Sequence, residues 1–309
     1  MSGQTEETAV DISCRDGIVL GGHLWRGGTL GRIIINPATG AAARYYHRYA
    51  RFLARQGLTV LTYDYRGIGL SRPVDIKRCC FRWRDWGEGD FAEAVRFMEG
   101  EGPLTVIGHS IGGFLIGLAE NAGRVDRVLT VGAQYAWWGD YAPGQRLGLF
   151  VKWHVVMPLL TAVHGYFPGR RLGWLEDLPA GVANEWSFRG PGFETSHPRA
   201  ERAAVLARMG RVTAPILAVA ISDDALGTVP AIQRTLGYYR QAPRTIAGIQ
   251  PGGYGCAKIG HFDLFHDRHM AGFWRDSLSW LCDGVNPWSD RIIASAWPGG
   301  STIDRLGAP

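Results

Sequence analysis

The chain has 309 residues, of which 46% are hydrophobic and 20% charged, and it carries a formal net charge of +5. This composition excludes a disordered tail, a collagen-like fibre and a bundle of membrane-spanning helices, while the length suits one large α/β domain with an insertion, or two small domains. The arginines are scattered rather than clustered, so the sequence gives no sign of a nucleic-acid-binding surface.

The cysteines and the N-terminal residues indicate a cytoplasmic protein. The 5 cysteines include an adjacent pair but no C-x-x-C spacing, so neither a disulfide framework nor a zinc site is expected. The first residues, MSGQTEETAVDIS, are polar and acidic, unlike a secretory signal. No apolar run of the sequence approaches the ~20 residues of a transmembrane helix. We therefore expect a reduced, cytoplasmic protein without membrane contact or cofactor.

Strands and helices alternate in the first part of the chain. After an N-terminal hairpin at 10–25, buried strands follow at residues 32–35, 58–63, 103–107 and 127–131. Amphipathic patterns between these strands predict helices at 44–56, 89–99 and 114–122. This alternation is typical of a mostly parallel sheet with helices on both faces.

The alternation stops at residues 134–209, which are rich in Trp, Gly and Pro and contain no pattern of buried strands. It resumes with strands at 215–221 and 245–249 and a final helix at 270–281. The middle stretch is therefore interpreted as an insertion between two parts of one core.

These patterns divide the chain into a core and two additions. Residues 1–133 and 210–284 form the core, residues 134–209 a helical cap, and the Gly-, Pro- and Ser-rich residues 285–309 a surface tail. The expected fold class is α/β, with a mostly parallel central sheet, flanking helices and an inserted helical cap.

The sharpest motif is GHSIGG at residues 108–113, between a predicted strand and a predicted helix. A serine at such a tight strand-to-helix turn has its hydroxyl lifted above the edge of the sheet. The turn crowds the positions two before and two after the serine, which are Gly108 and Gly112 here. We predict that Ser110 is a nucleophile and that the N–H of Ile111 is one donor to a developing oxyanion.

A serine nucleophile needs a base and an acid that orients the base. His261 follows the last predicted strand, and Asp223 and Asp224 follow the strand before it, so all three lie at the carboxyl edge of the sheet. The order Ser, Asp, His is one of three known chain orders for this triad. We predict that His261 is the base, while either aspartate can be the acid and the other can close the turn.

Further histidines stand close to His261 in the sequence. His266 and His269, with two aspartates nearby, match no metal-ligand spacing. We interpret them as surface histidines and expect no metal in this protein.

Two further segments complete the expected site. The loop at residues 36–41 has small side chains, and the N–H of Thr39, or of its neighbour Ala38, is the expected second oxyanion donor. The tryptophans of the cap are too many for an exposed excursion, so we expect Trp137 and Trp138 to line an apolar pocket above the serine. A helical layer without an opening to the serine is the alternative.

Together these motifs resemble the α/β-hydrolase superfamily over nearly the whole chain. The segments TYDYRGIGLSRP at 62–73 and GYFPG at 165–169 are similar to a group of lysophospholipase-like and serine aminopeptidase-like hydrolases. In the superfamily the acid sits three residues beyond a small residue that ends its strand. Ile221 occupies that position here, so the resemblance implies Asp224 rather than Asp223. Serine at the turn, rather than aspartate, disfavours the haloalkane and epoxide branches.

The resemblance and the predicted residues imply a serine hydrolase that cleaves an ester, thioester or related acyl bond through an acyl-enzyme. The expected partner is a small molecule with an apolar or aromatic acyl group, with no nucleic acid and no membrane; a homodimer stays open. One alternative is an acyltransferase or cyclase that passes the acyl group to an alcohol or amine. Another is a non-catalytic binding protein that has kept the fold.

Overall fold

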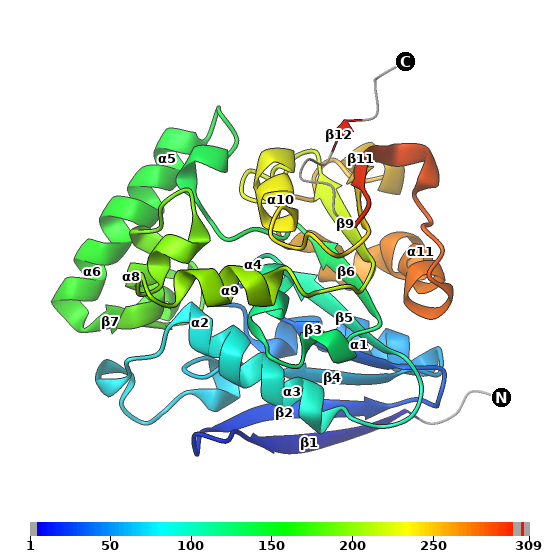
Figure 1. Ribbon diagram of the computed structural model, residues 1–309, viewed down its shortest axis with the longest axis horizontal. Helices are drawn as coiled ribbons and strands as arrows, with labels where there is room; N and C mark the ends of the chain where they lie inside the picture. Colours follow the sequence, from blue (N-terminus) through cyan, green and yellow to red (C-terminus); the bar gives the residue numbers. More distant parts are fainter. Residues whose placement is uncertain (1–4, 299–303, 306–309) are drawn as a thin grey trace.

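The computed structural model describes residues 5–298 and 304–305 (Figure 1). A 10-stranded sheet in the order β1-β2-β4-β3-β5-β6-β9-β10-β11-β12 forms its centre. The strands of this sheet are β1 (Glu6–Ser13), β2 (Val19–Arg26), β3 (Arg32–Asn36), β4 (Thr59–Tyr63), β5 (Leu104–His109), β6 (Arg127–Val131), β9 (Ile216–Ile221), β10 (Arg244–Ile249), β11 (Ile292–Ala296) and β12 (Asp304–Arg305).

The middle of the sheet is parallel, and its two margins are antiparallel. The pairs from β4 through β3, β5, β6 and β9 to β10 are all parallel, whereas β1, β2 and β11 pair antiparallel with their neighbours. This topology confirms the mostly parallel sheet expected from the alternating pattern. It also brings the carboxyl ends of the parallel strands to one edge of the sheet.

The alternation of side chains along each strand builds two hydrophobic cores, one on each face of the sheet. In β3, Ile34 belongs to one core, whereas Ile33 and Ile35 belong to the other. The core of Ile33 and Ile35 is covered by α1 (His47–Arg55) and the C-terminal helical segment around α11 (Arg275–Leu278). The other core is covered by α2 (Trp83–Asp85), α3 (Ala92–Phe97), α4 (Ile111–Phe114), α9 (Arg202–Met209) and α10 (Val229–Leu236) (Figure 1).

Several elements differ from the sequence prediction: α10 was not expected, and the helix expected at 89–99 begins earlier, with α2. Two further differences have a clear physical reason. The helix expected at 114–122 starts earlier and ends earlier, as α4 followed by a 3-10 turn at Leu115–Leu118. It begins directly after the serine turn, and three glycines, of which Gly117 packs against Tyr239, weaken its continuation. In the segment expected to be a surface tail, residues 292–296 instead form β11, which extends the sheet beside β10.

A mostly helical insertion, at the left of Figure 1, separates β6 from β9. Its longest element is a continuous helix from Arg146 to His164. The insertion contains α5 (Arg146–Phe150), a π-helical segment (Val151–Val156), α6 (Met157–His164), β7 (Tyr166–Phe167), α7 (Gly169–Leu172), β8 (Leu178–Pro179) and α8 (Ala180–Ser187). It meets the core at the loop after β3, where the Glu176 N–H donates to the Gly40 carbonyl oxygen at 2.8 Å.

Candidate active site

Ser110 lies in a strained turn between β5 and α4. Its φ of 55° and ψ of −124° fall in a region that residues with a Cβ rarely adopt. A Cβ at Gly108 would overlap with Gly113, and a Cβ at Gly112 would overlap with the Asn36 carbonyl oxygen. The structure thus confirms that both positions flanking the serine have room only for glycine.

His261 and Asp224 form a buried hydrogen-bonded pair. The His261 Nδ1 donates to Asp224 Oδ2 at 2.7 Å, and Asp224 Oδ1 accepts the N–H groups of Leu226 and Gly227 at 2.8 and 2.9 Å. Burial alone raises the pKa of this carboxyl, but His261 and these hydrogen bonds outweigh it and hold the pKa of Asp224 below its ordinary value. Asp224 is therefore an ionised acid that fixes the orientation of the imidazole.

Asp223 has a different role from its neighbour. Its two carboxylate oxygens accept the N–H groups of Ile259 and Gly260, at 2.9 and 2.8 Å. These residues directly precede His261, so Asp223 anchors the loop that carries the histidine. The structure brings Asp224, and not Asp223, to the imidazole itself.

Ser110 and His261 both contact one short stretch of backbone, Val131–Gly132. The Ser110 N–H donates to the Val131 carbonyl at 3.0 Å, and the His261 ring lies beside Gly132, where a Cβ would be 3.2 Å from Nδ1. The described residues contain no hydrogen bond between the two side chains; Ser110 Oγ accepts one from Gln134 Nε2 at 3.3 Å. In resting enzymes the nucleophile–base bond is often loose and tightens when substrate binds.

Behind the serine, a chain of hydrogen bonds joins three loops of the site. The Ala38 N–H donates to the Tyr46 hydroxyl at 3.0 Å, and this hydroxyl donates to His109 Nδ1 at 2.8 Å. The His109 Nε2–H then donates to the His261 carbonyl at 2.8 Å. Burial lowers the pKa of His109 to about 3, so the ring stays neutral and can accept at one nitrogen while donating at the other. His109 points away from the serine, as expected, and its hydrogen bond supports the backbone of His261.

The same chain of bonds separates the two candidates for the second oxyanion donor. The Ala38 N–H is occupied by Tyr46, whereas the Thr39 N–H has no partner among the described residues. Asn36 ties this loop to the serine turn, because its Nδ2 donates to the Gly112 carbonyl at 3.2 Å. Of the two predicted candidates, Thr39 is therefore the one whose backbone N–H stays free among the described residues.

A pocket of about 560 Å³ adjoins this loop. Its walls come from the loop after β3, from the segment after His261 and from the insertion, and they include Gly40, Tyr45, Trp174, Leu175, Phe262 and Phe265. The predicted Trp137 and Trp138 are not among its lining residues. The Arg234 guanidinium lies over the Trp137 ring at 4.4 Å, and the Trp138 ring packs on Phe150 at 5.1 Å.

Three residues near the site were not identified from the sequence: Gln134, Tyr46 and Trp174. Gln134 is the first residue of the predicted cap, Tyr46 lies at the start of α1, and Trp174 lies late in the cap. No motif or spacing marks them, because their positions depend on contacts between distant parts of the chain. Only the general richness of the cap in tryptophan pointed toward Trp174.

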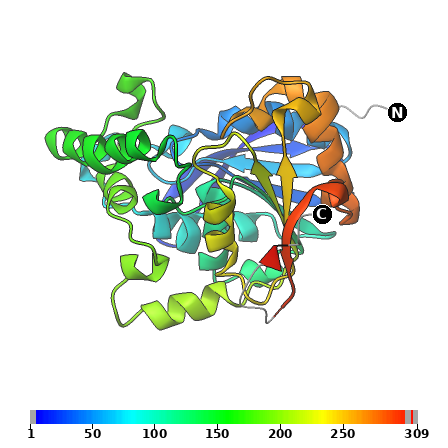
Figure 2. The same cartoon turned by 90° about the horizontal axis from the view of Figure 1, so that it is seen from above.

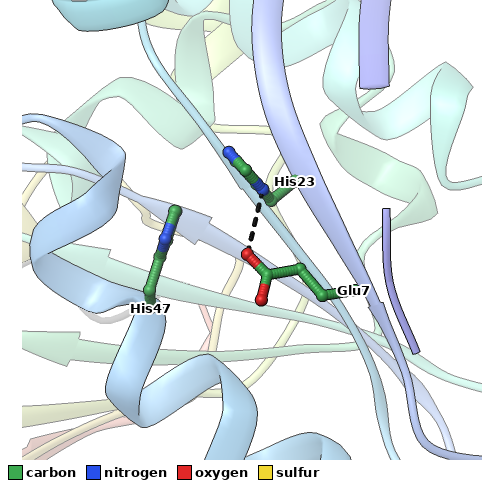
Figure 3. A group of neighbouring side chains, drawn as sticks. All are labelled: Glu7, His23 and His47. Atoms are coloured by element: carbon green, nitrogen blue, oxygen red, sulfur yellow. Dashed lines mark ion pairs between the residues drawn. The ribbon is translucent and has the colours of Figure 1, made fainter. Parts of the chain in front are cut away.

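A group of possible metal ligands, Glu7, His23 and His47, lies at the other margin of the sheet (Figure 3). Their ligand atoms all lie within 4.8 Å of one another. Glu7 already bridges His23 Nδ1 at 3.2 Å and the Arg51 guanidinium at 3.4 Å. The guanidinium opposes a second cation, so we interpret the group as an ion pair with packed rings.

Comparisons with known proteins agree with this architecture. The family model described as Serine aminopeptidase, S33 matches residues 29–177, which include Ser110. No curated protein sequence matches the chain. The solved structures that resemble the chain, described next, are 16% identical or less, so they establish its fold rather than its substrate.

Three of these solved structures cover most of the chain. The esterase Pf2001 of Pyrococcus furiosus is 16% identical, with 92% of this chain and 93% of that chain covered and a TM-score of 0.54. A monoacylglycerol lipase of Paleococcus ferrophilus is 15% identical, with 86% and 99% covered and a TM-score of 0.56. An esterase of Exiguobacterium antarcticum is 13% identical, with 89% and 99% covered and a TM-score of 0.55.

Proposed function

We propose that this chain, whose fold and family match place it with the α/β hydrolases, is a serine hydrolase that cleaves an ester, thioester or related acyl bond through an acyl-enzyme on Ser110. One observation carries the proposal: a histidine–aspartate pair, 2.7 Å long, and a serine held at a φ of 55° both contact the short backbone stretch at Val131 and Gly132. A binding protein has no need of a strained serine next to an oriented imidazole.

Each residue then has a defined step. Ser110 Oγ attacks the acyl carbonyl while His261 takes the hydroxyl proton, and the N–H groups of Ile111 and Thr39 receive the developing oxyanion. The leaving alcohol or thiol takes the proton from His261. Water then attacks the acyl-enzyme with His261 as base, which releases the acid and restores the serine.

The pocket beside the oxyanion loop supports a substrate class. One part of its lining combines the aromatic side chains of Tyr45, Trp174, Phe262 and Phe265 with Leu175, which suits an apolar or aromatic acyl group. The rest of the lining is polar and includes Arg44, Arg48, Glu176 and His266. The volume of about 560 Å³ is within the range typical of small-molecule sites.

Labelling with a fluorophosphonate probe tests the nucleophile directly. Wild-type protein should be labelled and should hydrolyse short acyl esters, whereas Ser110→Ala should lose both by several orders of magnitude. Ser222→Ala is a matched control, because Ser222 lies at the same edge of the sheet but is exposed and has no step in the reaction. Undiminished labelling of Ser110→Ala would contradict the assignment.

A second function, acyl transfer, is favoured by the burial of the site. Ser110 is only 5% exposed, and a site that excludes water allows an alcohol or amine to intercept the acyl-enzyme. Products of the wild-type enzyme in the presence of an added alcohol distinguish the two functions. Ester formation in excess over free acid supports transfer, and free acid alone supports hydrolysis.

A further inference from the structure

The longest helix of the cap, Arg146–His164, presents an apolar face to the outside of the molecule. It has 19 residues and a mean hydropathy of 1.4, yet only 17% of its apolar stretch is buried. A core helix would be mostly buried, and a signal sequence would lie near the N-terminus. Neither description fits this helix, which lies along the margin of the cap far from the central sheet (Figures 1 and 2).

All the residues of this helix that are exposed are apolar, namely Leu147, Gly148, Val151, Val155, Leu159, Ala162 and Val163. A surface helix normally shows the opposite pattern, with polar side chains toward water. Five of these residues, from Leu147 to Val163, recur at every fourth position. In an α-helix such residues drift slowly around the axis. The π-helical segment Val151–Val156 has more residues per turn and so keeps residues four apart closer to one face. The result is an exposed aliphatic stripe along the helix.

The opposite side of the helix is anchored in the cap. Trp153, Met157 and Thr161 are 5%, 0% and 2% exposed, and α6 packs against α8. The helix therefore cannot leave the cap to cross a bilayer without exposing these buried side chains. It is placed to lie flat on a surface.

The chain segment that contains the stripe carries charges of one sign. Residues 141–175 contain Arg146, Lys152, Arg170 and Arg171 but no Asp or Glu. Asp140 and Glu176, which flank this segment, are both engaged in ion pairs with arginines. Arg170 is paired with Glu176 at 2.7 Å, whereas the other three have no ion-pair partner among the described residues. The Lys152 ammonium lies 4.2 Å from the centre of the Trp174 ring, and an exposed tryptophan beside a lysine suits the boundary between water and lipid.

From this stripe and its charges we propose that the cap helix docks the protein flat on an anionic lipid surface. A second copy of the chain is the less favoured occupant. In a two-fold dimer the same patch meets itself, so the unpaired cations would face one another without a carboxylate to balance them. Anionic headgroups supply that balance, while the aliphatic stripe enters the acyl boundary.

The placement also connects the surface with the candidate substrate pocket. Trp174 packs against Trp153 of the cap helix, with ring centres 5.7 Å apart, and it also lines the pocket beside the oxyanion loop. An acyl substrate that leaves the lipid surface at the cap helix therefore meets the pocket at the same tryptophan. The docking itself does not depend on the proposed function.

Vesicle flotation with the full chain tests the docking. Wild-type protein should float with vesicles of phosphatidylcholine containing about one fifth phosphatidylserine, and less with phosphatidylcholine alone. The double variant Leu159→Asp/Val163→Asp should bind at least roughly tenfold more weakly. Leu30→Asp is the matched control, because Leu30 is 60% exposed, close to the 62% of Leu159, but lies outside the cap.

A charge variant and an activity readout complete the test. Lys152→Gln and Arg171→Gln should each weaken binding to the anionic vesicles by about fivefold and leave binding to neutral vesicles unchanged. The aspartate variant should still hydrolyse a short soluble ester, and Ser110→Ala should still float, so failure of docking and failure of catalysis are distinguishable. Absence of flotation, equal flotation of all variants, or a dimer that dissociates in Leu159→Asp/Val163→Asp without vesicle binding would each overturn the proposal.

Discussion

Replacing Asp224 by asparagine is expected to lower kcat roughly ten-thousandfold while the protein stays folded. The geometry gives the reason. Asp224 Oδ1 accepts two backbone N–H groups, from Leu226 and Gly227, and only a carbonyl oxygen can replace it there. The amide NH₂ of the asparagine must then face His261 Nδ1, at the place where the carboxylate oxygen of Asp224 accepts a hydrogen bond from Nδ1–H.

This arrangement reverses the tautomer of the His261 imidazole. With an NH₂ group opposite, Nδ1 must accept a hydrogen bond, so the ring proton moves to Nε2, the nitrogen that has to accept the proton of Ser110. The loss corresponds to about 5 kcal/mol of transition-state stabilisation, at about 1.4 kcal/mol for each factor of ten. The melting temperature should change little, because the backbone bonds to the side-chain oxygen are kept.

Asp223→Asn is the matched comparison at the adjacent position. Here both carboxylate oxygens accept backbone N–H groups, so the amide leaves one donor opposed by another donor. A cost of about 1–3 kcal/mol in stability is expected, with kcat reduced by less than roughly tenfold. Steady-state ester hydrolysis and chemical denaturation of both variants decide the matter. An Asp224→Asn enzyme within tenfold of wild type, or a reversed ranking, would refute this reasoning.

Three further predictions concern the core, the titration behaviour and the pocket. Gly112→Ala should destabilise the protein by roughly 2 kcal/mol in thermal or chemical denaturation, since its Cβ would overlap with the Asn36 carbonyl; Gly123→Ala, where nothing lies within 4 Å, should not. Because burial lowers the pKa of His109 from 6.5 to about 3, the unfolded chain binds a proton that the folded chain does not, and this contribution to stability is lost as pH falls below 6.5. In His109→Phe, stability measured between pH 6.5 and 5 should fall less steeply, by up to about 1.4 kcal/mol per pH unit; an unchanged slope contradicts the assignment. Trp174→Ala should shift the preferred acyl chain length in kcat/KM across a series of esters and leave fluorophosphonate labelling unchanged; a shift in Trp138→Ala alone would instead favour the pocket predicted from the sequence.

The fold was predictable because its pattern is repeated. Buried strands such as 32–35 and 127–131 alternate with amphipathic helices, and each repeat supports the same parallel sheet. β11 was not predictable in this way. Its five residues, Ile292–Ala296, lie in a Gly-, Pro- and Ser-rich segment, and only pairing with β10 makes them a strand.

Parts of the site were predictable because they follow from local geometry. Ser110 stands out through the steric demand on Gly108 and Gly112, a demand that acts within five residues. The choice of Asp224 over Asp223 needed a family resemblance, since adjacent carboxylates differ only in the backbone conformation of their turn. Contacts such as Gln134 to Ser110 join the insertion to the core, and no spacing in the sequence encodes them.

The buried chain from Ala38 through Tyr46 and His109 to His261 also constrains how relatives of this protein can diverge. Each member satisfies a polar group of the next in a place without water, so replacing one leaves its neighbour with an unmet hydrogen bond. Positions 46 and 109 should therefore change together during evolution, either as a tyrosine–histidine pair or as two apolar residues. The residue before the proposed nucleophile is thus expected to vary together with Tyr46, which lies 63 positions earlier in the chain.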